Sequence, residues 1–554
     1  MLRPLNQRRS NRRPHPIDRR RLLAAEYGPG AGKSSTGSVR IGLVYPNTYR
    51  VGMASLGFQI THQVLARAEG VMVERFFMDT LSEGSIESGA RLDRCHLIAI
   101  SSGFELDDPN VLEIIRIAGL PRFAADRVSG ALLCMGGVRV AINRLPLYPF
   151  IDVFFHGDAE RVLPAALERL VDCARAAAGR DAVIDAWHGM PGIEVTAGAR
   201  MAAGREPDAE GAGLVELCRI GEAAPASSWP RPAQPEALLA EPRSPASPAS
   251  SHILTPQCEF SDMALLDLAR GCPHGCTFCW IGRHSSPFRP RSGRDLYEHI
   301  ERLSHWTDRF GLVSSAVGAH PEVDPIVRFI VKRGFKLSYS SLRMEQTTPV
   351  MLDALVASGQ KTATIAPEAG SIRLRRLLGK PLCEEALLEG ARRFTAAGIE
   401  NLKLYFMLGI PTETTEEAME IARLIECIRQ AMLEAARARG RMGGIIVNLG
   451  IFVPKPGLPL NQLDPVPWQT VKRRLGRLIR ALERIPNTRI NASSVEQARA
   501  QRVLSMGGGE GAHYLALVVD SGGNWRRANR DWPMLRAFEQ EGAGCRGKAK
   551  KNAF

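Results

Sequence analysis

Short apolar runs alternate with amphipathic segments between residues 39 and 200 of the chain. Four of the runs have the length and β-branched content of buried strands, namely VRIGLVYP, LIAISSGF, ALLCMGG and IDVFFHGD. The stretches between them, such as LGFQITHQVLARA and AERVLPAALERLVDCA, place apolar residues at helical spacing. This alternation predicts an α/β domain built on a doubly wound parallel sheet over residues 39–200.

A second series of strand-like segments follows a change in composition. Residues 201–257 become rich in Pro, Ala and Ser, which predicts a linker. Beyond it lie MALLDLAR, GLVSSAV, KLSYSSL, TATIAP, NLKLYFMLG and IIVNLGIFV, with helical stretches separating most of them. These units predict a partial β/α barrel over residues 258–460, in which chemistry gathers at the carboxyl ends of the strands. Residues 461–554 then form a C-terminal extension with a basic tail.

The net charge of +14 is concentrated at the two ends of the chain. Eight arginines against one aspartate give residues 1–21 a charge of +7, and four basic residues after position 545 add +4. The folded body is therefore nearly balanced, and residues 1–38 are expected to form a basic disordered tail. Binding of a nucleic acid by the tails is the less favoured interpretation.

The apolar pattern and the cysteines also bear on the compartment. We find no run of eighteen apolar residues and no apolar stretch after the N-terminal charges, so we expect neither a membrane-spanning helix nor a secretory signal. Eleven cysteines without framework spacing do not indicate a disulfide scaffold. The expected location is the cytoplasm, with the cysteines present as thiols.

Three cysteines nevertheless cluster in RGCPHGCTFCW, where Cys272, Cys276 and Cys279 have the spacing CxxxCxxC. Three thiolates on one loop can each hold one iron of a cubane cluster and leave the fourth iron open to a substrate's amino and carboxylate groups. A structural zinc site usually closes with a fourth Cys or His. Because His274 and His284 lie close by, a non-catalytic zinc-binding scaffold stays open as an alternative.

The cysteine loop resembles that of the radical S-adenosylmethionine (SAM) superfamily, including the aromatic Phe278 before the third cysteine. Segments resembling the family's strand-end landmarks follow in order: SSAVGAHPEVD, YSSLRME, IAPEAGSIRLRRLLGK, LKLYFMLGIPTET and FVPKPGLPL. The resemblance implies a [4Fe-4S] cluster on the three cysteines, which cleaves SAM to a 5′-deoxyadenosyl radical. It also implies an electron donor such as flavodoxin or ferredoxin.

The same resemblance implies a set of SAM contacts at the strand ends. The segment from Ser314 to Ala316 would meet the methionine amino group, and Ser341, Arg343 and Glu368 would contact the ribose and the carboxylate. The full set of expected contacts is Phe278, Ser314, Ser315, Ala316, Ser341, Arg343, Glu368, Lys403 and Val453. Two simpler interpretations stay open: Arg343 and Glu368 could pair with each other, and Lys403 could form a salt bridge at the barrel mouth.

The upstream sheet resembles the cobalamin-binding domain that precedes the barrel in one branch of the superfamily, through GG and FIDVFFHGDAERVLPAAL. Contacts to cobalamin would come from Tyr45, Asn47, Gly52, Gly136, Gly137, Gly157 and Glu160. The signature DxHxxG, whose histidine ligates cobalt, is absent, and DAWHGMPG has the wrong spacing. Cobalamin would then bind without a protein ligand below the cobalt; alternatively, the sheet is a substrate or partner domain.

The pattern as a whole predicts a radical SAM enzyme that methylates or rearranges an unidentified substrate, with cobalamin as a possible second cofactor. An RNA- or protein-modifying enzyme related to methylthiotransferases is the alternative, motivated by the basic tails and the helix-like VKRRLGRLIRALERI. Methylthiotransferases carry a second set of three cysteines upstream. Cys95, Cys134 and Cys173 are too dispersed to match it well, and two of them lie by or in apolar strands.

Overall fold

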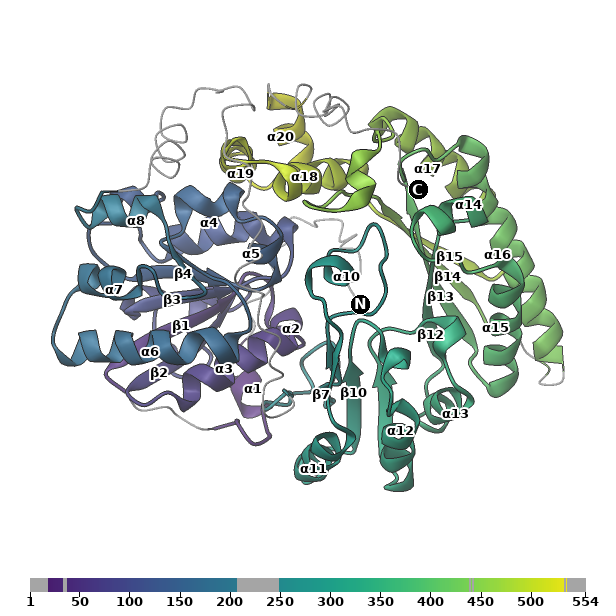
Figure 1. Ribbon diagram of the computed structural model, residues 1–554, viewed down its shortest axis with the longest axis horizontal. Coiled ribbons are helices and arrows are strands. Elements are labelled where there is room, and N and C mark those ends of the chain that lie inside the picture. Colours follow the sequence, from purple (N-terminus) through teal and green to yellow (C-terminus); the bar gives the residue numbers. More distant parts are fainter. Residues whose placement is uncertain are drawn as a thin grey trace.

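A six-stranded sheet forms the N-terminal half of the molecule, on the left of Figure 1. The computed structural model describes residues 18–32, 37–206, 249–437, 440, 443–532 and 535. The sheet has the order β2-β1-β3-β4-β5-β6, and all neighbours run parallel except β5 and β6. Its strands are β1 (Val39–Tyr45), β2 (Val71–Phe77), β3 (Leu97–Ser101), β4 (Leu132–Gly136), β5 (Val153–Phe155) and β6 (Ile193–Val195).

Helices cover both faces of this sheet, which confirms the predicted doubly wound domain. One face packs against α3 (Leu56–Arg67), α6 (Ala159–Arg175) and α7 (Arg180–Trp187) around Phe58, Leu170 and Trp187. The opposite face packs against α4 (Asp108–Ile117). Shorter helices are α2 (Tyr49–Gly52), α5 (Val138–Ile142) and α8 (Ala197–Ala202).

Two further sheets form an incomplete barrel, drawn in teal and green in Figure 1. Strands β11-β10-β7 make one sheet and β12-β13-β14-β15 the other, all parallel, and a bridge between Leu342 and Ile365 connects them. The strands are β7 (Ala264–Asp267), β10 (Arg309–Val313), β11 (Lys336–Tyr339), β12 (Thr362–Glu368), β13 (Asn401–Leu408), β14 (Ile445–Ile451) and β15 (Thr488–Ala492). The partial barrel is thereby confirmed.

The barrel helices lie on the outside of the strands. They are α11 (Gly293–Leu303), α12 (Val323–Lys332), α13 (Pro349–Ala357), α14 (Ile372–Leu377), α15 (Glu384–Ala397), α16 (Thr415–Ala436) and α17 (Trp468–Leu482). The short helix α10 (Trp280–His284) directly follows the cysteine loop and lies between the two halves of the molecule in Figure 1. A short antiparallel pair, β8 (Ala269–Arg270) and β9 (Arg289–Pro290), flanks the cysteine loop.

The C-terminal residues belong to both halves of the molecule. The boundary predicted at residue 460 falls between β14 and β15 of one sheet. Helices α18 (Val495–Met506), α19 (Glu510–Asp520) and α20 (Trp525–Asp531) instead return to the N-terminal domain, where Leu504, Leu515 and Val518 enter its core. In Figure 1 these helices bridge the two halves at the top.

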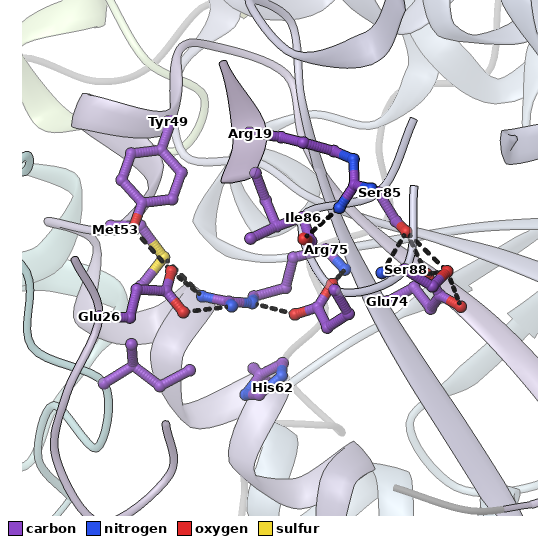
Figure 2. Close-up of polar contacts among 12 residues, drawn as sticks. Arg19, Glu26, Tyr49, Met53, His62, Glu74, Arg75, Ser85, Ile86 and Ser88 are labelled. Carbon is purple, nitrogen blue, oxygen red and sulfur yellow. Dashed lines mark hydrogen bonds and ion pairs between the residues drawn. The ribbon is translucent and has the colours of Figure 1, made fainter. Parts of the chain in front are cut away.

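The apolar pattern did not predict strand β2, because two charged residues, Glu74 and Arg75, interrupt its apolar run. Both are buried, and the guanidinium of Arg75 pairs with Glu26 at 2.7 Å (Figure 2). It also pairs with Glu87 at 2.5 Å. Glu26 belongs to residues 18–32, which lie within the segment expected to be a tail but form helix α1 (Arg19–Ala24) and pack on the domain. Residues 1–17, 207–248 and 536–554 lie outside the described residues, and so does most of the predicted linker.

Among the helices that the structure describes, none has the length and apolar content needed to cross a membrane.

The Arg75 network generates a stability prediction. Arg75→Met leaves Glu26 buried, with a side chain only 1% exposed and no cation, so we expect the free energy of unfolding to fall by about 3–5 kcal/mol. The double variant with Glu26→Met should recover part of this loss, because only Glu87, whose side chain is 24% exposed, then lacks its cation. Arg91→Met, which breaks an exposed pair with Asp93, is the matched control and should change stability by less than about 1 kcal/mol. Urea unfolding followed by circular dichroism measures all three, and equal effects of Arg75→Met and Arg91→Met would contradict the assignment.

Candidate active site

The three cysteines lie on one loop that follows β7, at the carboxyl end of a barrel strand. Cys276 is buried, and Cys272 and Cys279 are partly buried. Gly271 opens the loop with a φ of +77°, and a Cβ at this position would lie 2.2 Å from the carbonyl oxygen of Ser285. Glycine is therefore required where the loop begins and meets the segment that closes it.

The cysteine loop is fastened to the residues that follow helix α14. The backbone N–H of Thr277 donates to the carbonyl of Leu378 at 3.1 Å, and its hydroxyl donates to the carbonyl of Leu377 at 2.8 Å. A Cβ at Gly379 would lie 3.3 Å from the Cα of Cys276, so the two backbones pass close together. These contacts fix the loop against the segment that the sequence motif IAPEAGSIRLRRLLGK supplies.

The three thiols lie close enough together to affect one another's pKa. Burial raises the pKa of each thiol, and a second member of the trio raises it further in every case. Arg343 and Lys380 oppose this rise in the pKa of Cys272 and Cys276. Two cations beside three thiols favour the thiolate form, which is the form that binds metal.

This donor set fits a cubane cluster better than a single zinc ion. In the part of the chain that the structure describes, no three His, Cys, Asp or Glu side chains converge on one ion. A cubane does not need such convergence, because each thiolate binds its own iron. The two neighbouring histidines make other contacts: a ring nitrogen of His274 lies 3.2 Å from Gln346 Oε1, and the His284 ring stacks on Trp280 at 4.9 Å.

The structure brings the segments predicted to bind SAM to the same end of the barrel as the cysteine loop. Ser314, Ser315 and Ala316 follow β10, and Ser341 follows β11. The N–H of Ser314 donates to Ser340 Oγ at 3.0 Å, and that hydroxyl donates to the Ser314 carbonyl at 2.9 Å, so the two loops are tied together. Ser315 is exposed beside the buried Ser314.

Glu368 ends β12, and its ion-pair partner is not Arg343, the partner that the sequence suggested. Its carboxylate pairs with Lys380 Nζ at 3.0 Å, whereas Arg343 pairs with Glu345 at 2.6 Å. The alternative of a direct pair between Arg343 and Glu368 is therefore wrong. Burial raises the pKa of Glu368, and Lys380 and Arg343 oppose that rise. Glu368 also has a φ of +71°, a strained value for a residue with a side chain, where β12 shifts register.

Phe278 and Lys403 were also expected to contact SAM, and the structure places them in two different parts of the barrel. Phe278 packs against the apolar cluster that contains Phe452, the residue before Val453, and so joins the cysteine loop to the end of β14. Lys403 lies inside β13 rather than at the mouth of the barrel, with Nζ 5.3 Å from the ring centre of Tyr405. No described carboxylate forms an ion pair with Lys403, so the structure has no barrel-mouth salt bridge at this residue.

A cavity of about 400 Å³ opens between the N-terminal sheet and the barrel. Four of the residues expected to contact cobalamin line it, namely Gly136, Gly137, Gly157 and Glu160. Apolar side chains from β1, β3, β4, α3 and α6 form its inner end, and its outer end is formed by Asp267, Arg270, Trp280 and Ser285. The cavity therefore has one wall in each half of the molecule.

The other three expected contacts lie outside the cavity lining and have partners within their own domain. The Tyr45 ring packs edge-on against Phe58 at 5.6 Å. Asn47 donates its amide to Asp107 at 2.8 Å. A Cβ at Gly52 would lie 2.4 Å from the ring of Phe77, so close packing explains this glycine.

Arg270 is a site residue that the sequence analysis did not single out, although it directly precedes the cysteine loop. Its guanidinium pairs with Asp267 of the barrel at 2.9 Å and with Asp158 and Glu160 of the N-terminal domain at 2.8 and 2.7 Å. Burial disfavours its charge, but the three carboxylates together raise its pKa. The only sequence signal was the adjacency of an arginine to the cysteine loop and of two acidic residues to the end of β5.

Two family models match the chain. Residues 57–195 match the model described as "Radical SAM proteins, N-terminal", and residues 266–425 match "Radical SAM superfamily". The first region covers β2 to β6 of the N-terminal sheet, and the second runs from the end of β7 through the cysteine loop and β13 into α16.

Similar proteins have been found by sequence and by structure. The uncharacterized protein MJ0966 of Methanocaldococcus jannaschii is 24% identical over 75% of this chain and 78% of its own. The ribosomal protein uS12 methylthiotransferase RimO of a Thermotoga species is 25% identical over 41% of this chain and 53% of its own. The radical SAM methyltransferase TsrM of Kitasatospora setae shares the fold with a TM-score of 0.50 and 13% identity, over 92% of this chain and 99% of that one. With its cysteine loop, its partial barrel and its preceding sheet, the chain belongs to the radical SAM superfamily and carries that superfamily's N-terminal domain.

Proposed function

We propose that the chain is a cobalamin-dependent radical SAM enzyme that methylates or rearranges an unactivated carbon of its substrate. The observation that carries the proposal is the cavity, since it is lined both by the strand ends of the N-terminal sheet and by residues flanking the cysteine loop. A group bound over the sheet would then lie next to a group bound at the loop.

Within this proposal, Cys272, Cys276 and Cys279 hold the [4Fe-4S] cluster, which supplies the electron for reductive cleavage of SAM. Family membership implies both the cluster and SAM. Ser314 to Ala316, Ser341, Arg343 and Glu368 orient SAM from the strand ends, and Lys380 holds the Glu368 carboxylate in place. Phe278 packs with Phe452, the neighbour of Val453, on the apolar side of the site, which excludes water from a reactive species. A flavodoxin or ferredoxin is the proposed source of the electron.

The cavity suits cobalamin by shape and by chemistry. Gly136 and Gly137 at the end of β4 and Gly157 after β5 leave room for a close approach of a flat macrocycle to the backbone. The apolar slot between the sheet and helices α3 and α6 suits a buried organic tail. When bound, cobalamin supplies a carrier for a methyl group. The TsrM structure with the same fold contains cobalamin and a [4Fe-4S] cluster, which supports the proposal.

Cobalamin would bind here without the usual histidine below the cobalt. His188 in DAWHGMPG is exposed beyond the end of α7 and does not line the cavity. The residues that would hold the macrocycle are instead the glycines, with Glu160 at the rim held by Arg270. In the proposed binding mode, cobalamin is therefore held by the shape of the cavity and by apolar contacts rather than by a bond between the protein and cobalt.

The similarity to RimO gives less support to a methylthiotransferase, because that activity is associated with a second set of three cysteines. Cys95 and Cys134 are buried in the N-terminal domain, and burial raises the pKa of both thiols. Such thiols behave as small apolar side chains. Helix α17 does present a basic outer face, at Lys472, Arg473, Arg477 and Arg480, but its apolar face packs against the barrel core.

The cysteine loop provides the first test of the proposal. Replacing Cys272, Cys276 or Cys279 by Ala should abolish the cluster's visible absorbance and the formation of 5′-deoxyadenosine, because two protein thiolates hold a cubane poorly. The variant Cys383→Ala is the matched control, since that cysteine is exposed and outside the loop. Iron, sulfide and zinc are measured on anaerobically purified protein. Full activity in any loop variant, or one equivalent of zinc without iron, would reject the assignment.

Cobalt retention tests the cavity. Gly57 lines it from helix α3, and the only atom within 4 Å of a Cβ built there is Ser55 Oγ, at 4.0 Å, so Gly57→Trp fills the cavity without straining the backbone. We expect the unmodified protein to keep about one cobalt per chain after loading with hydroxocobalamin and desalting, and the variant to keep little. Gly137 would be a poor choice, because a Cβ there would lie 2.3 Å from the Ser102 carbonyl.

The control for this test is Gly476→Trp, a substitution in helix α17 away from the cavity. It should keep both cobalt and iron, and Gly57→Trp should keep its iron because the cluster ligands lie on another loop. If unmodified protein with a full cluster retains no cobalt, the N-terminal sheet is a substrate or partner domain, and methylation is no longer the proposed reaction.

A further inference from the structure

The two faces of strand β13 differ in a way that packing alone does not explain. Leu402, Leu404, Phe406 and Leu408 are fully or almost fully buried against the surrounding helices. The alternate residues, among them Lys403 and Tyr405, point to the concave side of the barrel and remain partly exposed. Strands of a parallel sheet are usually apolar on both faces, so a polar concave face requires another reason.

One row across the concave face leaves two hydrogen-bond donors without acceptors. Tyr405 of β13, Asn448 of β14 and Asn491 of β15 are register partners and so lie side by side. The amide of Asn491 donates to Asn448 Oδ1 at 3.1 Å, which leaves Asn448 Nδ2 as a donor facing away from Asn491. Asn448 is only 4% exposed, and neither its Nδ2 nor the Tyr405 hydroxyl has a hydrogen-bond partner in the structure. An unmade hydrogen bond at a buried group is unfavourable, so two in one row indicate a ligand that completes them.

A cation lies two residues before Tyr405 on the same face. Lys403 Nζ is 5.3 Å from the Tyr405 ring centre, and it forms no ion pair or hydrogen bond with any described residue. Three other lysines of the chain, Lys361, Lys380 and Lys455, each pair with a glutamate. Lys403 is thus a half-buried charge whose counter-ion is not provided by the described part of the protein.

We propose that Lys403, Tyr405 and Asn448 bind a carboxylate group of the substrate. The three side chains offer a positive charge and two neutral donors, so they suit an oxyanion with a single negative charge. Neighbouring strands are about 4.8 Å apart, which lets Tyr405 and Asn448 reach the two oxygens of one carboxylate. A phosphate fits less well, because its second negative charge would face a single cation, Lys403.

The location separates Lys403 from the other expected SAM contacts. Glu368 at the end of β12 is level with Phe406, whereas Lys403 is level with Thr364. Three residues of strand correspond to about 10 Å, so the backbone of Lys403 lies that much deeper in the barrel than Glu368, and Tyr405 lies between the two levels. Lys403, which the sequence resemblance assigned to SAM, is thereby reassigned to the substrate. This inference rests on the proposed function, because it takes the barrel interior to be the reaction chamber.

Protection of Lys403 from acetylation tests the proposal without a known substrate. The holoprotein is treated anaerobically with the neutral reagent N-hydroxysuccinimidyl acetate, and modification of each lysine is followed by peptide mass spectrometry. The probes are acetate, butyrate and phenylacetate, each compared with its primary amide and with inorganic phosphate. At about four times its dissociation constant, a bound carboxylate should slow acetylation of Lys403 about fivefold. Lys361, whose side chain is 59% exposed, is the internal control and should react at an unchanged rate.

Variants identify the other two donors. Tyr405→Phe removes the hydroxyl and should weaken the protection, and Asn448→Asp places a negative charge in the row and should abolish it. Tyr297→Phe, on the outer helix α11 against Phe329, is the matched control and should leave the protection unchanged. Equal protection in Tyr405→Phe, Asn448→Asp and unmodified protein would place the carboxylate elsewhere and overturn the proposal.

The same preparations are assayed for 5′-deoxyadenosine and for cobalt. These assays distinguish a failure of the carboxylate site from a failure of the proposed function. If SAM is cleaved but no carboxylate protects Lys403, the carboxylate site is refuted and the proposed function stands. If carboxylates protect Lys403 but SAM is not cleaved, the proposed function is refuted and the binding site stands. Equal protection by the amides, or stronger protection by phosphate, would also overturn the assignment of a carboxylate.

Discussion

The relative placement of the two halves of the molecule depends on the guanidinium of Arg270. One side of it meets Asp267, the last residue of β7, and the other meets Asp158 and Glu160 at the end of β5. A guanidinium can serve three carboxylates because its five donors point outward in a plane. Asp267 is also held by Arg291 at 2.5 Å, so the junction is an alternating network of charges rather than a single pair. Since Cys272 lies two residues after Arg270, the same contact that joins the domains also sets the position of the cysteine loop.

A second junction on the other side of the active end makes the arrangement rigid. Lys455, which follows β14, pairs with Glu105, which follows β3, and Ser505 of α18 hydrogen-bonds to both. Burial alone would raise the pKa of Glu105, but the charge of Lys455 lowers it to about 2. Removing one partner of such a buried pair leaves an uncompensated charge, so each half of the molecule stabilises the other in one orientation. The C-terminal helices take part in this junction, which explains why α18 to α20 pack on the N-terminal domain after the barrel is complete.

The sequence predicted elements with strong apolar periodicity and failed where charges are satisfied by distant residues. Four strands of the N-terminal sheet and six of the barrel were found, because each is a short apolar run between helical segments. Strand β2 was missed because Glu74 and Arg75 find their partners at positions far along the chain. Strand β15 was missed because TRINA is short and mostly polar, being an edge strand that faces the concave side with Asn491.

The same distinction applies to the candidate site. Motif spacing located the cysteine loop and the segments around Ser314, Ser341 and Glu368, because these residues lie next to recognisable strand ends. It could not assign Lys380 to Glu368, since that pair depends on how helix α14 turns the chain back. Nor could it find the role of Arg270, whose partners in the other domain lie more than a hundred residues earlier in the chain. Contacts between elements that are distant in sequence follow from topology and packing, which a local pattern does not contain.

The incomplete barrel explains why the two domains share one chamber. A closed barrel fills its interior with side chains, whereas here two sheets meet through a single bridge, between Leu342 and Ile365, and β7 is an edge of the three-stranded sheet. Residues 249–251 cover that edge through backbone bonds from Asp267 to Ala249 and from Ser251 to Leu265. The chain enters the barrel through β7 from the N-terminal domain and returns to that domain after β15, so both ends of the open barrel are anchored to the same partner. The carboxyl ends of the N-terminal strands therefore close the space beside the cysteine loop, and the cavity between them is a consequence of the connectivity.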